Sequence, residues 1–444
     1  MAYGALGGGG FTVQNKVLPG TYTKMISQPG ITQVWKDRGY GAIALDLSWG
    51  EENGIVTITN ERLMNNCEKL FGCDFTDPEL KPIRDIMKGA KVLHLYNLNN
   101  GGTKATLKLG TLTVTAKYPG KNGNKLAVAI EEDVNREGFY RIETYLDGIL
   151  KDEQAIDKLE DFDDNGFITL SGSLSETSVS LRSKLEGGDN GTVKAGAHGD
   201  FLSKIQGEYF NVIAYAGTDE SIKGLYEQFV KTMVYEAGYM CQLVLHRAKV
   251  NDRFISNVCY DSVGSENMAD SVFWYFGQSA GVELGKSVSA VIYNGEYDIE
   301  TLTDTYDATS AIEKGQLKMI KTDGEIKLLE DINSFTNFSK ELTEDWALNE
   351  VVRIVMQRVQ NISMLFNKYY MHKELNDDIG RNKLWADVAY DAKERFQNQL
   401  RIIENYTEED TRVTKGEQKG GVVIYDAITP VVTMSKLYLT VAIA

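Results

Sequence analysis

The chain has 444 residues, of which 42% are hydrophobic, so it is long enough for two to four domains with well-developed cores. Its net charge of −16 at pH 7 argues against a nucleic-acid-binding protein, because such binding relies on basic residues that neutralise phosphates. No apolar run approaches the roughly 18–20 residues of a membrane-spanning helix, the start does not read as a signal peptide, and the four scattered cysteines are expected to be reduced thiols.

Residues 1–30 are predicted to form an N-terminal arm. A glycine run over residues 7–10 precedes a short strand whose apolar residues share one face: Phe11, Val13 and Val17. Pro19 and Gly20 then turn the chain away, so this strand has no hairpin partner nearby. An unpaired strand can pair with another chain through its free N–H and C=O groups, although it could also pair within its own domain.

Two stretches, residues 31–100 and 198–340, are predicted to form an α/β body. Strands are expected at residues 41–47, 55–58, 90–96, 210–214, 242–245 and 254–260. Helices are expected at residues 61–71, with Asn60 as the N-cap, and at residues 220–239.

Residues 101–197 between these stretches are predicted to form an inserted, small β-domain, because short alternating runs are separated by Gly, Asn and Asp turns. The insert is acidic: from Glu131 to Asp164 there are thirteen acidic and four basic residues. Residues 161–166 match the first half of a calcium-binding loop, but Gly172 stands where the closing glutamate belongs. An acidic β-turn is therefore expected there.

The stretch from Ala280 to Ser287 satisfies a loose phosphate-loop pattern. A phosphate loop follows a strand and opens a helix, whereas here a helical pattern precedes the stretch and a strand-like run, residues 288–293, follows it. Glu283 would also place a carboxylate among the phosphates. Nucleotide binding is kept only as a weak alternative.

No other catalytic or metal-binding pattern is present in the sequence. The four histidines are isolated, and neither an HExxH helix nor a Gly-x-Ser-x-Gly turn occurs. The chain is therefore predicted not to be an enzyme, with no catalytic residues, no metal ligands and no cofactor.

Residues 341–421 are predicted to form a helical domain. Thr343 is the expected cap of a first helix with an apolar seam at heptad spacing: Leu348, Val352, Val355, Val359, Ile362, Phe366 and Tyr369. This seam suits a buried core helix or, alternatively, a partner-facing coiled coil. A second helix, residues 381–405, is expected to turn Trp385, Val388, Ala392, Phe396, Leu400 and Ile403 inward.

Residues 422–444 are predicted to form closing strands and a C-terminal arm. One β-rich run contains Val422 and Ile424, and the last run places four residues on one face: Leu437, Leu439, Val441 and Ile443. Like the N-terminal strand, the last run has no hairpin partner, so both ends are candidates for inter-subunit strands.

The order of several motifs resembles contractile tail sheath proteins of bacteriophages and of phage-tail-like (R-type) bacteriocins. The matching segments are residues 116–126 (AKYPGKNGNKL), 331–336 (DINSFT), the helix pair, the loop 415–421, and 429–441 (TPVVTMSKLYLTV). The resemblance covers essentially the whole chain, and is best from about residue 200. The Gly-Lys-Ser stretch has no assignable role in it.

The resemblance implies a structural subunit that polymerises in stacked, hexameric rings around an inner tail tube protein and contracts to drive the tube through a cell envelope. It also implies baseplate and tail terminator partners, an outward-facing insert, synthesis in a bacterial host cytoplasm and a place in a virion tail or tail-like particle. A non-contractile tube or capsid-like protein is the main alternative. In an otherwise acidic chain, the basic residues of the two C-terminal helices are the tube-facing candidates: Lys368, Lys373, Arg381, Lys383, Lys393, Arg395 and Arg401.

Overall fold

The computed structural model describes residues 7–9, 20–22, 38–99, 101–175, 178–194 and 196–442, and it divides into two compact units, residues 1–37 and 38–444. In the first unit β1 (Gly7–Gly9) pairs in parallel with β2 (Gly20–Tyr22). The predicted strand with Phe11, Val13 and Val17 lies outside the described residues.

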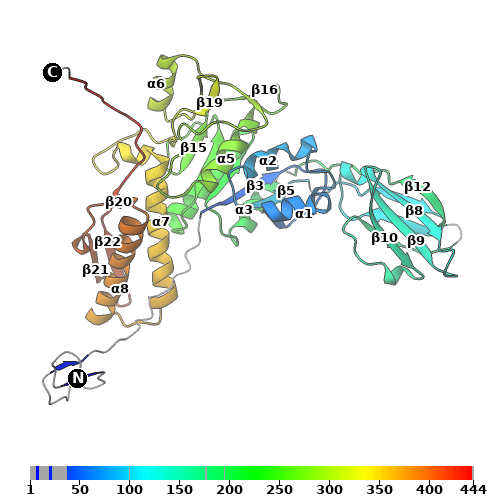
Figure 1. The fold of residues 1–444 in the computed structure, drawn as a ribbon, viewed down its shortest axis with the longest axis horizontal. Helices are drawn as coiled ribbons and strands as arrows, with labels where there is room; N and C mark the ends of the chain where they lie inside the picture. The colour runs from blue at the N-terminus through cyan, green and yellow to red at the C-terminus, as the bar shows by residue number, and fades with distance from the viewer. Residues whose placement is uncertain are drawn as a thin grey trace. The chain divides into compact units, whose positions relative to one another are not determined.

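The body of the second unit is built on a six-stranded sheet of order β15-β14-β13-β3-β5-β4 (Figure 1). Its strands are β3 (Tyr40–Leu45), β4 (Ile55–Thr59), β5 (Val92–Asn97), β13 (Val212–Tyr215), β14 (Gln242–His246) and β15 (Ile255–Val258). All neighbouring strands run parallel except β4, which pairs antiparallel with β5. The predicted α/β body is confirmed, with strand bounds shifted by a few residues.

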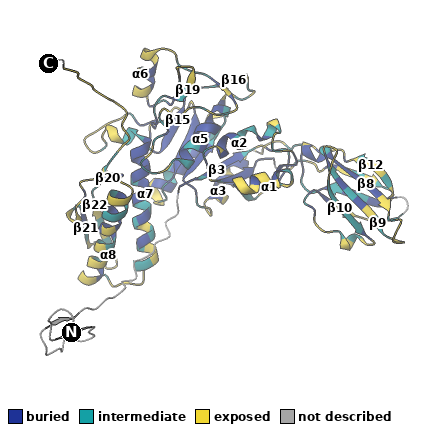
Figure 2. Ribbon diagram, viewed as in Figure 1, coloured by how far each residue is buried: buried dark blue, intermediate teal, exposed yellow. Residues whose placement is uncertain are grey.

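Helices cover both faces of this sheet, so its strands are buried on two sides and read as nearly continuous apolar runs. The helices on these two faces are α1 (Asn60–Phe71), α2 (Lys81–Met87), α3 (Ala197–Ile205), α4 (Glu220–Lys231) and α5 (Val272–Gly281). A further helix, α6 (Thr305–Glu313), lies later in the body, and its buried residues belong to neither of the cores that flank the sheet. Ile43 of β3 packs in the core formed with α1, α2 and α5, whereas its neighbours Ala42 and Ala44 pack in the core formed with α3 and α4. Figure 2 shows these central strands as buried.

The insert is a two-sheet β-domain, as predicted. One sheet has the order β10-β9-β8-β12 and the other the order β11-β7-β6. Its strands are β6 (Thr106–Leu109), β7 (Leu112–Ala116), β8 (Leu126–Glu132), β9 (Tyr140–Leu146), β10 (Ile149–Ile156), β11 (Ile168–Ser171) and β12 (Ser180–Lys184). The inward residues of both sheets share one core, which also takes in Trp49 of the body.

Short antiparallel pairs follow in the second half of the body. They are β16 (Ser262–Val263) with β17 (Asp298–Ile299), and β18 (Met319–Thr322) with β19 (Glu325–Leu328). The prediction of a strand at residues 288–293 is wrong, since these residues form a loop with an isolated β-bridge at Ile292.

The C-terminal region contains the two predicted helices and two small strand pairs. Two details of the prediction are wrong: Thr343 precedes a short 3-10 turn, Glu344–Ala347, rather than the first helix, and Leu400, which follows the second helix, is exposed. Helix α7 (Asn349–Leu365) continues as a wider turn over Phe366–Tyr370, and α8 (Asp378–Tyr390) continues over Asp391–Gln399. The strand pairs are β20 (Ile403–Glu404) with β23 (Thr429–Pro430), and β21 (Thr411–Lys415) with β22 (Val422–Asp426). Within the described part of the chain, no helix combines the length and apolar character needed to cross a membrane.

The burial of α7 differs from the predicted seam. Val355, Val359 and Ile362 are only half-buried, whereas Asn349, Arg353 and Gln357 on another face are fully buried. The reason is that α7 packs on two sides, with Val352 and Met356 in a body core and Ile354 in a core formed with Phe396 and Ile402. The buried-helix interpretation is therefore the correct one.

Candidate functional site

The chain ends in an exposed segment. Residues 431–442 have no regular secondary structure, so the strand predicted from Leu437 is not formed within the single chain, and Ile443 lies outside the described residues. Four large side chains of this segment expose between 74% and 90% of their surface: Leu437, Tyr438, Leu439 and Val441. Apolar side chains gathered in water in this way are typical of a segment that a partner covers.

The start of this segment is fixed to the body of the chain. The Val431 N–H donates to the Ile402 carbonyl at 2.8 Å, and the Thr433 N–H and hydroxyl donate to the Glu350 carboxylate at 3.0–3.3 Å. Glu350 is buried on α7. From Met434 onward the described residues are exposed, and Figure 1 shows this segment leading away from α7.

The β21–β22 hairpin is a second exposed feature. Val422 and Ile424 pair with Lys415 and Val413, and they pack against the cluster that contains Leu384. These two residues thus have a strand partner within the chain, which the predicted inter-subunit role did not anticipate. The opposite face exposes Val423 and Tyr425, and no third strand among the described residues joins the hairpin. Its outer edges can accept another strand.

The basic residues predicted to face a partner lie on the two C-terminal helices and their extensions or, for Lys373 and Arg401, just after them, and they fall into two groups. Four have polar or charged neighbours in the chain: Arg381 pairs with Asp378, Lys383 with Glu374 and Lys393 with Glu408, and Arg395 is half-buried beside Asp391. In the described residues Lys368, Lys373 and Arg401 form no ion pair, and all three are exposed. Only the second group is free to meet a charged partner without breaking an existing pair.

A buried arginine ties this region together. Arg358 of α7 donates to both carboxylate oxygens of Asp426 at 2.8 and 3.0 Å and to Asp391 at 2.8 Å. Although burial opposes its charge, the hydrogen bonds and charges of the two carboxylates hold the pKa of Arg358 above its ordinary value. Burial raises the pKa of Asp391. One guanidinium therefore joins α7, the extension of α8, and β22.

A second buried network joins α7 to the body. The Asp331 carboxylate accepts hydrogen bonds from the Tyr275 hydroxyl at 2.8 Å, from Asn349 at 3.1 Å, from Arg353 at 2.7 Å and from the Val288 N–H at 3.1 Å. Burial opposes ionisation, yet the charge and hydrogen bond of Arg353 hold the pKa of Asp331 below its ordinary value. Asp331 opens the DINSFT motif, so this motif connects the body to the C-terminal helix.

These polar residues were not among the predicted site residues, but the sequence holds a signal for them. Four polar residues of α7 recur at a spacing of four, on a face distinct from the apolar seam: Asn349, Arg353, Gln357 and Asn361. All four are buried. A polar row with helical spacing inside an otherwise apolar helix indicates a buried hydrogen-bond network.

The Ala280–Ser287 stretch is a packed loop. Its first two residues end α5 and the rest form the loop, where the Lys286 carbonyl accepts a hydrogen bond from Arg353 and the Lys286 ammonium pairs with Glu283 at 2.9 Å. Gly285 has a φ of +75°, and a Cβ there would lie 2.5 Å from the Ile402 methyl group. The glycine thus permits close packing on the C-terminal region, and the helix precedes the loop, which argues against a phosphate loop.

The acidic stretch 161–166 begins at the end of a short 3-10 turn, Leu159–Asp161, and is otherwise irregular backbone held by side-chain hydrogen bonds rather than the expected β-turn. The Gly166 N–H donates to Asp164, which also pairs with Lys117 at 2.5 Å, and the Asn165 side chain accepts from the Phe167 and Ile168 N–H groups. The side-chain oxygens of Asp164 and Asn165 are therefore bonded within the protein.

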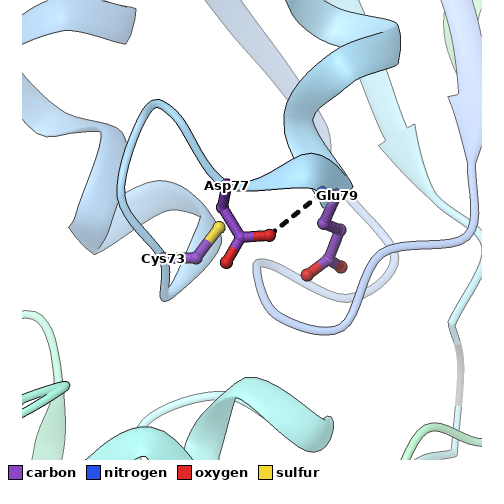
Figure 3. A group of neighbouring side chains, drawn as sticks. All are labelled: Cys73, Asp77 and Glu79. Carbon is purple, nitrogen blue, oxygen red and sulfur yellow. Dashed lines mark hydrogen bonds between the residues drawn. The ribbon is translucent and has the colours of Figure 1, made fainter.

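Cys73, Asp77 and Glu79 place one potential ligand atom each within 4.8 Å of one another (Figure 3). Both carboxylates are already used: Asp77 accepts from Lys125 at 2.8 Å, and Glu79 accepts from the Ser48 N–H at 2.6 Å and from Asn122 at 2.8 Å. Burial raises the pKa of the Cys73 thiol well above its ordinary value, which disfavours the thiolate that a metal needs. The group therefore does not fit a metal site.

The same group instead joins the insert to the body. Asn122 and Lys125 belong to the turn at Lys121–Lys125 inside the AKYPGKNGNKL motif, and Asn122 also donates to the Phe71 carbonyl at 2.9 Å. A second link is the 2.7 Å ion pair between Lys151 and Glu68. Gly120 has a φ of +122°, and a Cβ there would lie 2.0 Å from the Ser48 carbonyl oxygen, so this position needs glycine. The motif thus docks the insert.

We expect Asn122→Ala to loosen this junction, because it removes the side-chain donor to the Phe71 carbonyl and one of the two donors to the Glu79 carboxylate. The free energy of unfolding should fall by about 1–3 kcal/mol, and hydrogen exchange should accelerate at residues 72–80 and 121–125. Asn135→Ala, in an exposed turn of the same domain, is the control. Equal exchange rates in both variants would contradict the docking role.

A pocket of about 60 Å³ at the carboxyl ends of β3 and β5 is lined by Trp49, Arg62, Asn97 and Tyr118, among others. Ligand pockets for cofactor-sized molecules usually measure about 300–1,000 Å³. The pocket is too small for a nucleotide.

Three family models match the chain. They are the tail sheath protein Gp18 domain III N-terminal region at residues 38–98, the phage tail sheath protein central domain at residues 191–334, and the phage tail sheath C-terminal domain at residues 341–444. The β-sheets of the insert fall between the first two matched ranges.

Individual proteins agree with these matches. The chain is 25% identical to the phage-like element PBSX protein XkdK of Bacillus subtilis, over 99% of this chain and all of that protein. The crystal structure of a sheath tail protein from Desulfitobacterium hafniense is 26% identical and has a TM-score of 0.81, covering 95% of this chain and 99% of that one. The anti-feeding prophage sheath in its contracted state shares the fold, with a TM-score of 0.56, 12% identity and coverage of 96% and 99%.

Proposed function

Because the chain belongs to the phage tail sheath family, we propose that it polymerises in stacked, hexameric rings around an inner tail tube protein and contracts to drive that tube through a cell envelope. The observation that carries the proposal is the presence in one chain of an exposed, apolar C-terminal segment and of a hairpin with open edges. The subunit is structural and uses no cofactor. It is made in the bacterial host cytoplasm, and baseplate and tail terminator proteins cap the assembly.

Subunits connect by strand exchange in this proposal. The segment with Leu437, Leu439, Val441 and Ile443 adds to an open edge of the β21–β22 hairpin of a neighbour, and the arm with Phe11, Val13 and Val17 adds a further strand. Main-chain hydrogen bonds supply the connection, and the alternating apolar face fixes the register. The exposed Val423 and Tyr425 offer an apolar surface to the added strand.

Contraction then moves bodies while the arms stay connected. The Asp331 and Arg358 networks support this separation of moving bodies from connected arms. They bind α7 both to the body and to the rest of the C-terminal region. The extended state is metastable, and its release needs no nucleotide. The acidic insert, docked on the body through its own motif, lies on the outer surface away from the tube.

The tube attaches through exposed basic side chains. We expect Lys368→Glu with Lys373→Glu, and separately Arg401→Glu, to weaken tube attachment and make it more sensitive to salt, while the subunit stays folded. Each exposed ion pair contributes only about 0–1 kcal/mol, but the contacts repeat over many subunits. Co-sedimentation of sheath with purified tube across a salt titration measures the effect.

Lys314→Glu, at an exposed position after α6, changes the net charge as much as Arg401→Glu does, and Lys314→Glu with Lys321→Glu, also exposed, matches the double variant; these are the controls. Attachment that is the same in all variants at every salt concentration would place the tube contact elsewhere. The paired residues Arg381, Lys383, Lys393 and Arg395 form the second set to examine.

Electron micrographs of particles before and after triggering test the proposed function as a whole. The expected result is a sheath that becomes shorter and wider around a tube of constant length. A sheath of unchanged length would favour the alternative, a non-contractile tube. A nucleotide titration tests the remaining alternative, and binding that depends on Lys286 would support an enzyme.

A further inference from the structure

Two buried arginines, Arg38 and Arg353 of α7, lie close enough for the charge of Arg353 to lower the pKa of Arg38. Arg353 exposes 1% of its surface, and Arg38, the first residue of the larger unit, exposes 7%. Arg38 donates to the Ser279 carbonyl at 3.1 Å, and Arg353 donates to the Lys286 carbonyl at 3.1 Å and to Asp331. Two cations at such depth need compensating negative charge, because the interior strengthens their repulsion.

The nearby carboxylate compensates only one of them. Both oxygens of Asp331 already accept two hydrogen bonds each, so they have no place for Arg38. Burial, and next the charge of Arg353, lowers the pKa of Arg38 to about 9, which still leaves it protonated at neutral pH. The described groups at this place therefore carry an excess positive charge.

The same place holds several buried polar atoms without a partner among the described residues. They are Arg38 Nε, Arg353 Nε, Arg353 Nη1 and Ser279 Oγ. Ser279 lies one turn after Tyr275 on α5, and Tyr275 contacts Asp331, so these atoms gather around the α5–α7 contact. The three nitrogen atoms can only donate, and the hydroxyl can also donate. The missing partner is therefore an acceptor.

We propose that this cluster binds one small inorganic anion, such as chloride, between Arg38, Arg353 and Ser279. An anion accepts from all the orphan donors and cancels the excess charge, which a water molecule does not. The residues are nearly inaccessible to solvent, which suits a monatomic anion better than sulfate or phosphate. The bound anion would hold the start of the body, α5 and α7 together.

Thermal unfolding of the full-length chain tests the site. At constant ionic strength, replacing sodium gluconate by sodium chloride or bromide should raise the Tm by about 2–4 °C. Arg38→Met should lose this anion dependence, because one cation and one orphan donor are gone. Arg412→Met, at an exposed position of β21, should keep it and so controls for general salt effects.

Crystals of the unmodified chain grown in bromide give an independent measurement that does not depend on a variant. An anomalous peak within hydrogen-bond distance of Arg38 and Arg353 would support the proposal. Water alone at this place, or a carboxylate of the chain itself, would overturn it. An equal Tm response of Arg38→Met and Arg412→Met would also overturn it.

Discussion

Deleting residues 437–444 is expected to leave a folded, soluble subunit that no longer forms long sheaths. The described residues of this segment are exposed, so their removal costs the isolated subunit little. In an assembly, burying each of Leu437, Leu439 and Val441 in a neighbour would contribute about 1.5–3 kcal/mol, and the added strand would satisfy the open edge of the hairpin. Thermal unfolding checks the fold, and negative-stain microscopy measures sheath length.

Point variants separate the apolar face from the mere presence of the segment. Replacing Leu437, Leu439 and Val441 together by Ser should shorten sheaths as the deletion does, whereas Thr440→Ser with Ala442→Ser changes only the opposite face and should not. A chain without residues 1–18 is the companion truncation, with the same expected phenotype. Sheaths of normal length from either truncation would refute strand exchange.

The sequence predicted the body well because its strands carry a local signal. Buried parallel strands are continuous apolar runs, such as β14 (Gln242–His246), and α1 begins where polar capping residues precede an amphipathic pattern. The cap itself is Thr59 rather than Asn60, since the Thr59 hydroxyl accepts from the Arg62 N–H. Such one-residue differences in the position of a cap depend on the backbone conformation, which the order of residue types does not determine.

The buried networks around Asp331 and Arg358 could not be predicted, because the residues that form them are distant in sequence. Arg353 meets a carboxylate 22 residues away, and Arg358 meets carboxylates 33 and 68 residues away. The heptad seam of α7 drew attention to Val355, Val359 and Ile362, which are half-buried. When a helix packs on two sides, its regular apolar spacing does not show which of its polar residues are also buried. The strand at 437–444 was predicted from its alternation, but a strand needs a partner, and the single chain provides none among its described residues.

Arg358→Met is expected to lower the free energy of unfolding by about 3–5 kcal/mol. The substitution leaves Asp391 and Asp426 buried without their cation, and breaking a buried pair costs more than the pair contributes. Methionine keeps much of the volume, so the effect reports on charge rather than on a cavity. Denaturant unfolding measures the loss, with Arg412→Met on neighbouring β21 as the control.

Neutralising the two carboxylates should restore much of this stability. In the triple variant Arg358→Met, Asp391→Asn and Asp426→Asn, the amide oxygens still accept the bonds from Asn361 and Thr411, and no uncompensated charge remains. If Arg358 joins only the C-terminal elements, hydrogen exchange in the single variant should accelerate in residues 349–430 and stay slow in β13 and β14. Equal acceleration across the body sheet would mean that α7 couples the two regions into one cooperative unit.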